Sequence, residues 1–241
     1  MPVPVVLTGR LTRLEPLAPH HAEGLAQAGA EDRTSYAFTP VPHDLEAART
    51  YVDRALADQA AGRALPFAVV RAGDGQVVGS TRFLELDYWQ GPLVWPAVPG
   101  VPYGDPVTAI PDAAEIGNTW LAAHAQGTGI NTEAKLLMLS HAFDTWRVRR
   151  VSLRADARNV RSCTAIERLG LTCEGVRRAH SRGLDGAVRS TAFYSVLDDE
   201  WPAVRAIVQL RLAAGSTAAA IRPAGGSPAR TDGHDGRLVP A

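Results

Sequence analysis

Cysteine is scarce in this chain. The 241 residues include two, Cys163 and Cys173, which form neither a Cys-x-x-Cys motif nor the pattern of a disulfide framework. A disulfide-stabilised secreted domain is therefore excluded, and a reduced intracellular setting is favoured. The sequence predicts a cytoplasmic protein.

Long apolar runs and charge of one sign are also missing. No stretch approaches the ~20 apolar residues of a membrane-spanning helix. The first residues, MPVPVVLTGRL, have too short an apolar run and too much proline for a signal peptide. Lys plus Arg number 25, as do Asp plus Glu, so the formal net charge is zero. We therefore expect neither a membrane nor a nucleic acid as partner.

Three kinds of ligand site lack their motifs. A P-loop requires a Gly-Lys-[Ser/Thr] tripeptide, which does not occur. A dinucleotide fingerprint needs a third glycine near Thr132 and a buried aliphatic strand before it, whereas this strand carries Glu115, Asn118 and Thr119. The histidines and cysteines show no metal-ligand spacing, so no metal is expected.

What the chain does contain is a strand, a glycine-containing loop and a long helix within residues 115–146. Residues 116–121 alternate with the period of two that is typical of a half-polar strand. The helix after the loop has apolar residues at spacings of three, four and three, which places them on one face. These residues are Leu136, Leu139, Phe143 and Trp146.

The loop between them, Gln126-Gly127-Thr128-Gly129-Ile130-Asn131-Thr132, has the composition of an anion-binding turn. Two glycines let the backbone turn tightly and expose successive N–H groups, and the helix start adds its own unpaired N–H groups and positive dipole end. This geometry cradles a phosphate or pyrophosphate. Asn131 either crowds that group or caps the helix by accepting a backbone N–H.

The order of elements over the whole chain is β-α-α-β-β-β-α-β-α-β-β-α, which predicts a mixed sheet with helices on both faces. Residues 88–111 hold six prolines among several aromatics, which predicts a long functional loop. Residues 213–241 are low in bulky apolar groups and predict a disordered tail. Strands are expected at 10–17, 66–71, 76–86, 116–121, 150–156, 171–179 and 189–197, and helices at 19–27, 44–62, from the loop to 146, at 159–169 and from Asp198 or Asp199 to 212.

At this point a family resemblance is clear. Gln126-Gly127-x-Gly129-x-Asn131 resembles the coenzyme-A signature [Gln/Arg]-x-x-Gly-x-[Gly/Ala] of the GNAT acetyltransferases, with Asn131 in place of the last small residue. The segments NTEAKLLMLSHAFD, ARNVRSCTAIERLGLTCEGVRR and YSVLDDEWP resemble the RimJ/RimL-like branch. The resemblance implies an α/β GNAT fold over residues 1–212, with a mixed, mostly antiparallel central sheet, a splayed strand pair and helices on both faces.

The resemblance also implies acetyl-CoA as cofactor and the residues that hold it. The pantetheine arm would pair with the central strand near Trp120 and Leu121, and Asn159 and Ser162 would lie beside it. For Asn159 the structural alternative is a simple helix N-cap. The pyrophosphate would be bound by the loop residues, namely Gln126, Gly127, Thr128, Gly129, Ile130, Asn131 and Thr132.

Four residues are candidates for proton transfer. Ser162 or Tyr194 would protonate the departing thiolate, although Ser162 also suits the first turn of a helix and a strand tyrosine is more often packed. Glu115 and Glu85 are candidate bases for the acceptor amine, and the alternative for each is an exposed glutamate at a strand end.

These features predict an acetyl-CoA-dependent N-acetyltransferase in which a primary amine attacks the thioester directly in a ternary complex. The acceptor is a small molecule or a protein N-terminus. The alternative is an acyl-CoA-binding regulatory module of the same fold without turnover. The aromatics of the 88–111 loop would either wall the acceptor cleft or form a homodimer contact, and the sequence favours neither.

Overall fold

The computed structural model describes residues 2–89 and 110–221. Most of the predicted 88–111 loop, and residues 222–241 of the predicted tail, lie outside these residues. The strands are β1 (Leu7–Thr8), β2 (Thr12–Pro16), β3 (Ala64–Arg71), β4 (Val77–Asp87), β5 (Ala113–Leu121), β6 (Arg150–Asp156), β7 (Thr172–Arg182) and β8 (Val188–Leu197). The helices are α1 (Ala22–Ala30), α2 (Leu45–Ala60), α3 (Ile130–Ser140), α4 (Val160–Glu167) and α5 (Trp201–Ile221).

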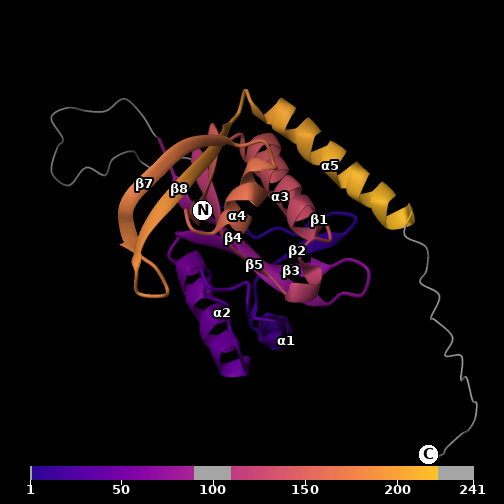
Figure 1. Ribbon diagram of the computed structural model, residues 1–241, viewed down its shortest axis with the longest axis vertical. Coiled ribbons are helices and arrows are strands. Elements are labelled where there is room, and N and C mark those ends of the chain that lie inside the picture. Colours follow the sequence, from indigo (N-terminus) through magenta and orange to yellow (C-terminus); the bar gives the residue numbers. More distant parts are fainter. Residues whose placement is uncertain (1, 90–109, 222–241) are drawn as a thin grey trace, which may run out of the picture.

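The eight strands form one sheet in the order β1-β2-β3-β4-β5-β6-β8-β7. Among the described strands, only β5 and β6 run parallel, and the other neighbours are antiparallel. Figure 1 shows α1 and α2 on one side of the sheet and α3, α4 and α5 on the other. The mixed, mostly antiparallel sheet with helices on both faces is therefore confirmed.

The strands β5 and β6 separate after a short pairing. Only Ala113, Ala114 and Glu115 pair with β6, at Arg150–Ser152, while β6 pairs with β8 along its whole length. Among the described strands, none pairs with the edge of β5 that faces β6 from residue 116 to residue 121. This is the splayed pair that the family resemblance implies, and it opens a cleft in the middle of the sheet.

A β-bulge interrupts β5 at Asn118, whose φ is 48°. Ser80 and Arg82 of β4 are two residues apart, yet they pair with Trp120 and Gly117, which are three apart. Paired residues face the same side of a sheet, so Gly117 and Trp120 lie on one face. The regular alternation predicted for residues 116–121 is therefore wrong, because the extra residue reverses the faces beyond Asn118.

The apolar core lies between the sheet and both helix layers. Phe67 and Phe83 are fully buried with their ring centroids 6.1 Å apart, and Phe83 also lies 4.6 Å from the Trp146 ring. The predicted apolar face of the long helix is present, but its last turn, His141–Trp146, is π-helical. Asp44 caps α2 as predicted, because its side chain accepts a hydrogen bond from the N–H of Ala47 at 2.8 Å.

The final helix is longer than the sequence pattern predicted. α5 continues to Ile221, so residues 213–221 are helical, and this part of the predicted disordered tail is wrong. The segment AAGSTAAAI has one bulky apolar residue, Ile221, but alanine is the strongest helix former and extends a helix that is already nucleated. Within residues 2–89 and 110–221, no helix combines the length and the apolar character needed to cross a bilayer.

Candidate active site

A cleft of about 400 Å³ lies where β5 and β6 part. One wall is the free edge of β5 and the other is the end of β6 with the start of α4. The loop before α3 closes one end, and Glu115 with Arg154 lies at the other. We call this hollow the β5–β6 cleft.

The glycine loop at the end of the cleft has the predicted turn geometry. Gly127 and Gly129 have φ values of 74° and 90°, in the left-handed region that favours glycine. Gly129 is the N-cap of α3 and makes no side-chain cap bond, so the first N–H groups of the helix have no capping side chain. A Cβ added to Gly127 would meet nothing within 4 Å, which leaves space beside the loop. These features suit a bound anion.

Asn131 does not cap the helix, so that interpretation is wrong. It lies one residue inside the start of α3, where its side chain lines the cleft. Its Oδ1 atom is buried without a hydrogen-bond partner among the described residues. A buried amide oxygen without a donor costs free energy, so this atom is suited to accept a hydrogen bond from a ligand.

Gln126 fixes the loop against its surroundings. Its Nε2 donates hydrogen bonds to Ser35 Oγ at 3.0 Å and to the Leu121 carbonyl at 2.9 Å. Its Oε1 accepts from Arg161 Nη1 at 2.5 Å. Arg161 is exposed in the first turn of α4, so this contact brings a guanidinium to the anion-binding loop. Arg161 was not predicted as a site residue, because it lies 35 positions from Gln126 in the sequence.

The predicted cofactor residues fall into two groups. Trp120, Leu121, Gln126, Gly127, Asn131, Asn159 and Ser162 line the cleft. Thr128, Gly129, Ile130 and Thr132 are not part of the lining in the described chain. Thr128 instead donates its hydroxyl to the Ala125 carbonyl at 2.7 Å, and Ile130 is buried. Thr128 and Ile130 therefore help to hold the loop in shape.

Asn159 and Ser162 have the structural roles that were open alternatives and also line the cleft. Asn159 is the N-cap of α4, and its Oδ1 accepts from the N–H of Ser162 at 3.1 Å. Both side chains are half-buried at the cleft surface. Capping and ligand contact are therefore compatible at this helix start.

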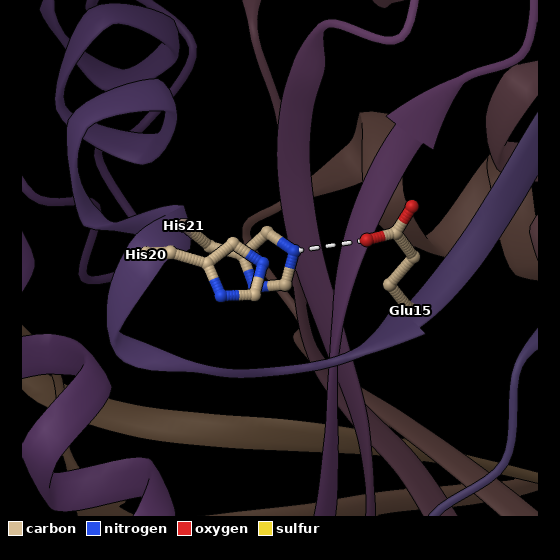
Figure 2. A group of neighbouring side chains, drawn as sticks. All are labelled: Glu15, His20 and His21. Atoms are coloured by element: carbon tan, nitrogen blue, oxygen red, sulfur yellow. Dashed lines mark hydrogen bonds and ion pairs between the residues drawn. The ribbon is translucent and has the colours of Figure 1, made fainter.

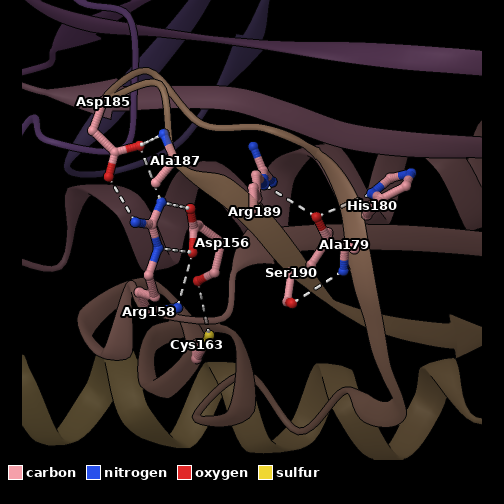
Figure 3. A network of polar contacts seen from close by, with 10 residues as sticks. Asp156, Arg158, Cys163, Ala179, His180, Asp185, Ala187, Arg189 and Ser190 are labelled. Carbon is pink, nitrogen blue, oxygen red and sulfur yellow. Dashed lines mark hydrogen bonds and ion pairs between the residues drawn. The ribbon is translucent and has the colours of Figure 1, made fainter.

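A network of ion pairs holds this helix start in place, as Figure 3 shows. Arg158 donates to the buried carboxylate of Asp156 at the end of β6 and to Asp185 in the β7–β8 turn. The guanidinium of Arg158 holds the pKa of both carboxyl groups below the usual range. The network therefore ties the β7–β8 hairpin to the cleft wall, and Arg189 of β8 also lines the cleft.

The two candidate bases have different surroundings. Glu115 is 4% exposed and forms an ion pair with Arg154, whose Nε lies 3.0 Å from Glu115 Oε1. Burial raises its pKa to about 7, although the Arg154 charge opposes the rise. Glu85 reaches the same guanidinium at 3.3 Å, but its side chain is 63% exposed and is not part of the cleft lining in the described chain. Glu85 is therefore an exposed glutamate, as the alternative interpretation has it, whereas Glu115 is buried.

Tyr194 lies on β8 with a buried side chain, and its hydroxyl donates to Glu167 Oε1 at 3.0 Å. Burial and the neighbouring Cys163 and Glu167 raise the pKa of this phenol. Tyr194 is not among the described residues that line the cleft. The structure therefore places Tyr194 in a packed position against the α4 residues Cys163 and Glu167.

Lys135 is a second cleft residue that the sequence analysis missed. It lies in α3, one turn after Asn131, and only 3% of it is exposed. Its Nζ donates to Thr119 Oγ1 at 2.6 Å and to Thr81 Oγ1 at 3.3 Å. Burial lowers its pKa to about 7. The available signal was its rarity, because the chain contains no other lysine.

One group of side chains away from the cleft has ligand atoms close enough for a metal ion. Ligand atoms of Glu15, His20 and His21 lie within 4.8 Å of one another (Figure 2). His21 is buried and already uses both ring nitrogens, because Nδ1 accepts from the Ala18 N–H and Nε2 lies 3.2 Å from Glu15. Arg13 also pairs with Glu15. These hydrogen bonds connect β2 to the start of α1, so the three side chains have a structural role without a metal ion.

Comparison with known proteins agrees with this geometry. Residues 10–172 match the family model described as an acetyltransferase (GNAT) domain. YdaF of Bacillus subtilis, described as a candidate ribosomal N-acetyltransferase, is 34% identical over 88 residues, which are 36% of this chain and 47% of YdaF. The match therefore spans about half the length of this relative.

Two solved structures show how far the fold likeness extends. A GCN5-related N-acetyltransferase from Brucella melitensis has a TM-score of 0.72 and 26% identity, over 88% of this chain and 86% of that one. RimJ of Mycobacterium smegmatis, solved with CoA-disulfide, has a TM-score of 0.67 and 20% identity, over 86% and 95%. The RimJ likeness concerns the fold alone. Since the family model covers more than half of the chain, the predicted family is confirmed, and this chain belongs to the GNAT acetyltransferase domain family.

Proposed function

We propose that this chain transfers an acetyl group from acetyl-CoA to a primary amine. The observation that carries the proposal is the β5–β6 cleft itself, which joins an anion-binding loop at one end to the buried carboxyl group of Glu115 at the other. The first end suits a nucleotide pyrophosphate and the second suits the deprotonation of an amine. An acyl-CoA-binding module without turnover would have no use for the second.

The residues at the loop end fit acetyl-CoA. The loop and the start of α3 offer backbone N–H groups, and the Arg161 guanidinium adds positive charge beside them. The free edge of β5 offers backbone groups that would pair with the pantetheine arm near Trp120 and Leu121. The buried Oδ1 of Asn131 would accept an N–H from the same arm. Acetyl-CoA, when bound, supplies an acetyl group activated as a thioester.

Glu115 is the residue that we assign as the base. An α-amino group with a pKa of ~8 is mostly protonated at neutral pH and must lose that proton before it attacks a carbonyl carbon. The pKa of Glu115 is about 7, close to that of such an amine, so its carboxylate can accept the proton. The amine then attacks directly, the C–S bond breaks, and no covalent bond to the enzyme forms.

Ser162 is the candidate that we favour for protonating the departing thiolate. Its half-buried side chain lines the cleft, whereas the Tyr194 hydroxyl is engaged with Glu167. A thiol with a pKa of ~8.5 leaves well with little help. We therefore assign Ser162 a smaller share of catalysis than Glu115.

The match of pKa values also favours the acceptor class. An N-terminal α-amine at ~8 can be deprotonated by a carboxylate at about 7 far more readily than a lysine amine at ~10.4. We propose an α-amine, either of a protein N-terminus or of a small molecule. The name of YdaF as a ribosomal N-acetyltransferase supports testing protein N-termini first.

The test is calorimetric titration with acetyl-CoA, followed on the same sample by thiol release with a panel of peptides and small amines. We expect saturable binding and amine-dependent thiol release. Arg161→Gln should weaken acetyl-CoA binding about tenfold, while Arg168→Gln, at the other end of α4, should leave it unchanged. Absence of binding would overturn the proposal, and binding without release by any amine would favour the regulatory module.

A further inference from the structure

Lys135 is buried in a way that apolar packing does not explain. The only lysine of the chain has its amine enclosed between α3, β4 and β5. Its hydrogen-bond partners in the described chain are two hydroxyl groups, and no carboxylate is among them. A methionine of similar length would fill the same space without the desolvation of an amine. Because burying this amine is unfavourable, we look for a functional role of Lys135.

The two hydroxyl partners differ in what they can reach. Thr81 Oγ1 is fully buried, and its hydroxyl donates to Met138 Sδ at 3.7 Å. Thr119 Oγ1 lies 2.8 Å from Thr81 Oγ1 and belongs to a half-buried residue that lines the β5–β6 cleft. Because Lys135 donates to Thr119 and Thr81 donates to Met138, the Thr119 hydroxyl keeps its own proton to donate. That proton can turn from Thr81 Oγ1, or from the Gly117 carbonyl at 3.5 Å, to a ligand in the cleft.

Thr119 also occupies a particular place on β5. It follows the bulge at Asn118 and lies on the part of the strand edge that has no partner in β6. Asn131, with its unpartnered Oδ1, lies one turn before Lys135 on α3. The cleft thus has an acceptor from Asn131 and a donor from Thr119 on its α3 side, opposite the side where Glu115 lies.

We propose that Lys135 polarises the Thr119 hydroxyl so that it donates a hydrogen bond to the acyl group of a thioester bound in the cleft. Negative charge develops on the carbonyl oxygen of that group when an amine attacks, and it passes to the departing thiolate sulfur when the C–S bond breaks. A donor aimed at developing charge lowers the barrier without transferring a proton. Thr119 would touch the reacting group, and Lys135 is a positioning residue that acts through it. The inference rests on the proposed acetyl transfer.

The first arm of the test compares four variants by steady-state thiol release. Thr119→Val and Lys135→Met should each lower kcat about tenfold to a hundredfold, with the KM for acetyl-CoA changed less than about twofold. Thr119→Ser keeps the hydroxyl and should recover most of the loss. Thr81→Val removes the other hydroxyl from Lys135 without touching the cleft, and it should change kcat little. Equal losses in Thr81→Val and Thr119→Val would overturn the proposal and leave a structural role.

The second arm does not depend on turnover. Carbon-13 labelling of lysine at the ε-carbon alone gives one side-chain NMR signal, because Lys135 is the only lysine. Acetyl-CoA should move this signal in the wild type and in Thr81→Val, and much less in Thr119→Val. An unmoved wild-type signal at saturating acetyl-CoA would overturn the inference. Failure of the wild type to bind acetyl-CoA in calorimetry would overturn the proposed function as well, so the two failures are distinguishable.

Discussion

The two faces of β5 bury ionisable groups of opposite sign. On the face towards α2, Glu115 is enclosed with one guanidinium, and burial raises its pKa to about 7. On the face towards α3, Lys135 is enclosed with two hydroxyl groups, and burial lowers its pKa to about 7. Desolvation thus shifts the pKa of the carboxyl group upward and the pKa of the amine downward, so that both pKa values are about 7.

The comparison shows how one bulged strand serves both faces. Because of the extra residue at Asn118, Glu115 and Trp120 lie on the same face, and Thr119 faces α3. In a regular strand Glu115 and Thr119, four residues apart, would share a face. The bulge therefore separates the proposed base from the proposed donor and places them on opposite sides of one cleft.

The largest effect is expected from removing the carboxylate. Glu115→Gln should lower kcat about 100-fold or more, because general base catalysis typically contributes that much. The wild-type rate should rise with pH through about 7 as Glu115 loses its proton, and this step should be missing from the variant. Glu85→Gln is the matched control, since Glu85 meets the same Arg154 guanidinium from an exposed position. Similar pH–rate profiles for both variants would contradict the assignment.

A smaller effect is expected from removing the guanidinium of Arg154, which gives Glu115 a neighbour of opposite charge. The Arg154 charge holds the pKa of Glu115 down, so Arg154→Met should raise it and move the acid limb of the pH–rate profile upward by about 1 unit. Arg150→Met is the control, because Arg150 lies on the same strand but pairs with Glu174. A limb that stays in place would mean that Arg154 does not control the titration.

The comparison between these faces was only partly accessible from the sequence. The mixed sheet with helices on both faces and the Gln126–Asn131 loop follow from periodicity and from a motif with its own local geometry, whereas the splayed strands were implied by the family resemblance. Glu115 was a candidate because it lies on the central strand, but its burial depends on residues far away in the chain. A contact such as Arg161 with Gln126 leaves no periodic signal.

The bulge and the last helix show two other reasons for error. One extra residue in a short strand of mixed polarity moves every residue beyond it to the opposite face of the sheet. Asparagine is among the residue types that tolerate positive φ, but Asn118 alone gives no sequence signal that it adopts this conformation. A composition low in bulky apolar residues predicted disorder after residue 212, whereas the helix propensity of alanine continues α5 to Ile221. Only a single lysine within an apolar helix could have marked Lys135.

The free energy of unfolding should depend on pH more strongly through Lys135, whose described partners are two hydroxyl groups, than through Glu115, which is paired with a guanidinium. An unfolded lysine titrates near 10.4 and Lys135 near 7, so the folded state binds fewer protons between these values and stability rises with pH across this window. The destabilisation is fully present below about pH 7. Lys135→Met should therefore be more stable than the wild type by about 1–3 kcal/mol at pH 6. Chemical denaturation should show this gain shrinking by pH 9, and a gain independent of pH would contradict a buried amine with a lowered pKa.

The smallest effect provides the reference for that measurement. Asp44 caps α2, away from both faces of β5, and accepts from the Ala47 N–H at 2.8 Å. Asp44→Ala should lower the free energy of unfolding by about 1 kcal/mol, because one helix N–H loses its acceptor. Asp44→Asn keeps an acceptor oxygen and should restore most of it. The Ala variant should lose a similar amount at pH 6 and pH 9. If its loss varied with pH as much as the Lys135→Met gain, the pH dependence would belong to the whole fold and could not be assigned to the amine beneath β5.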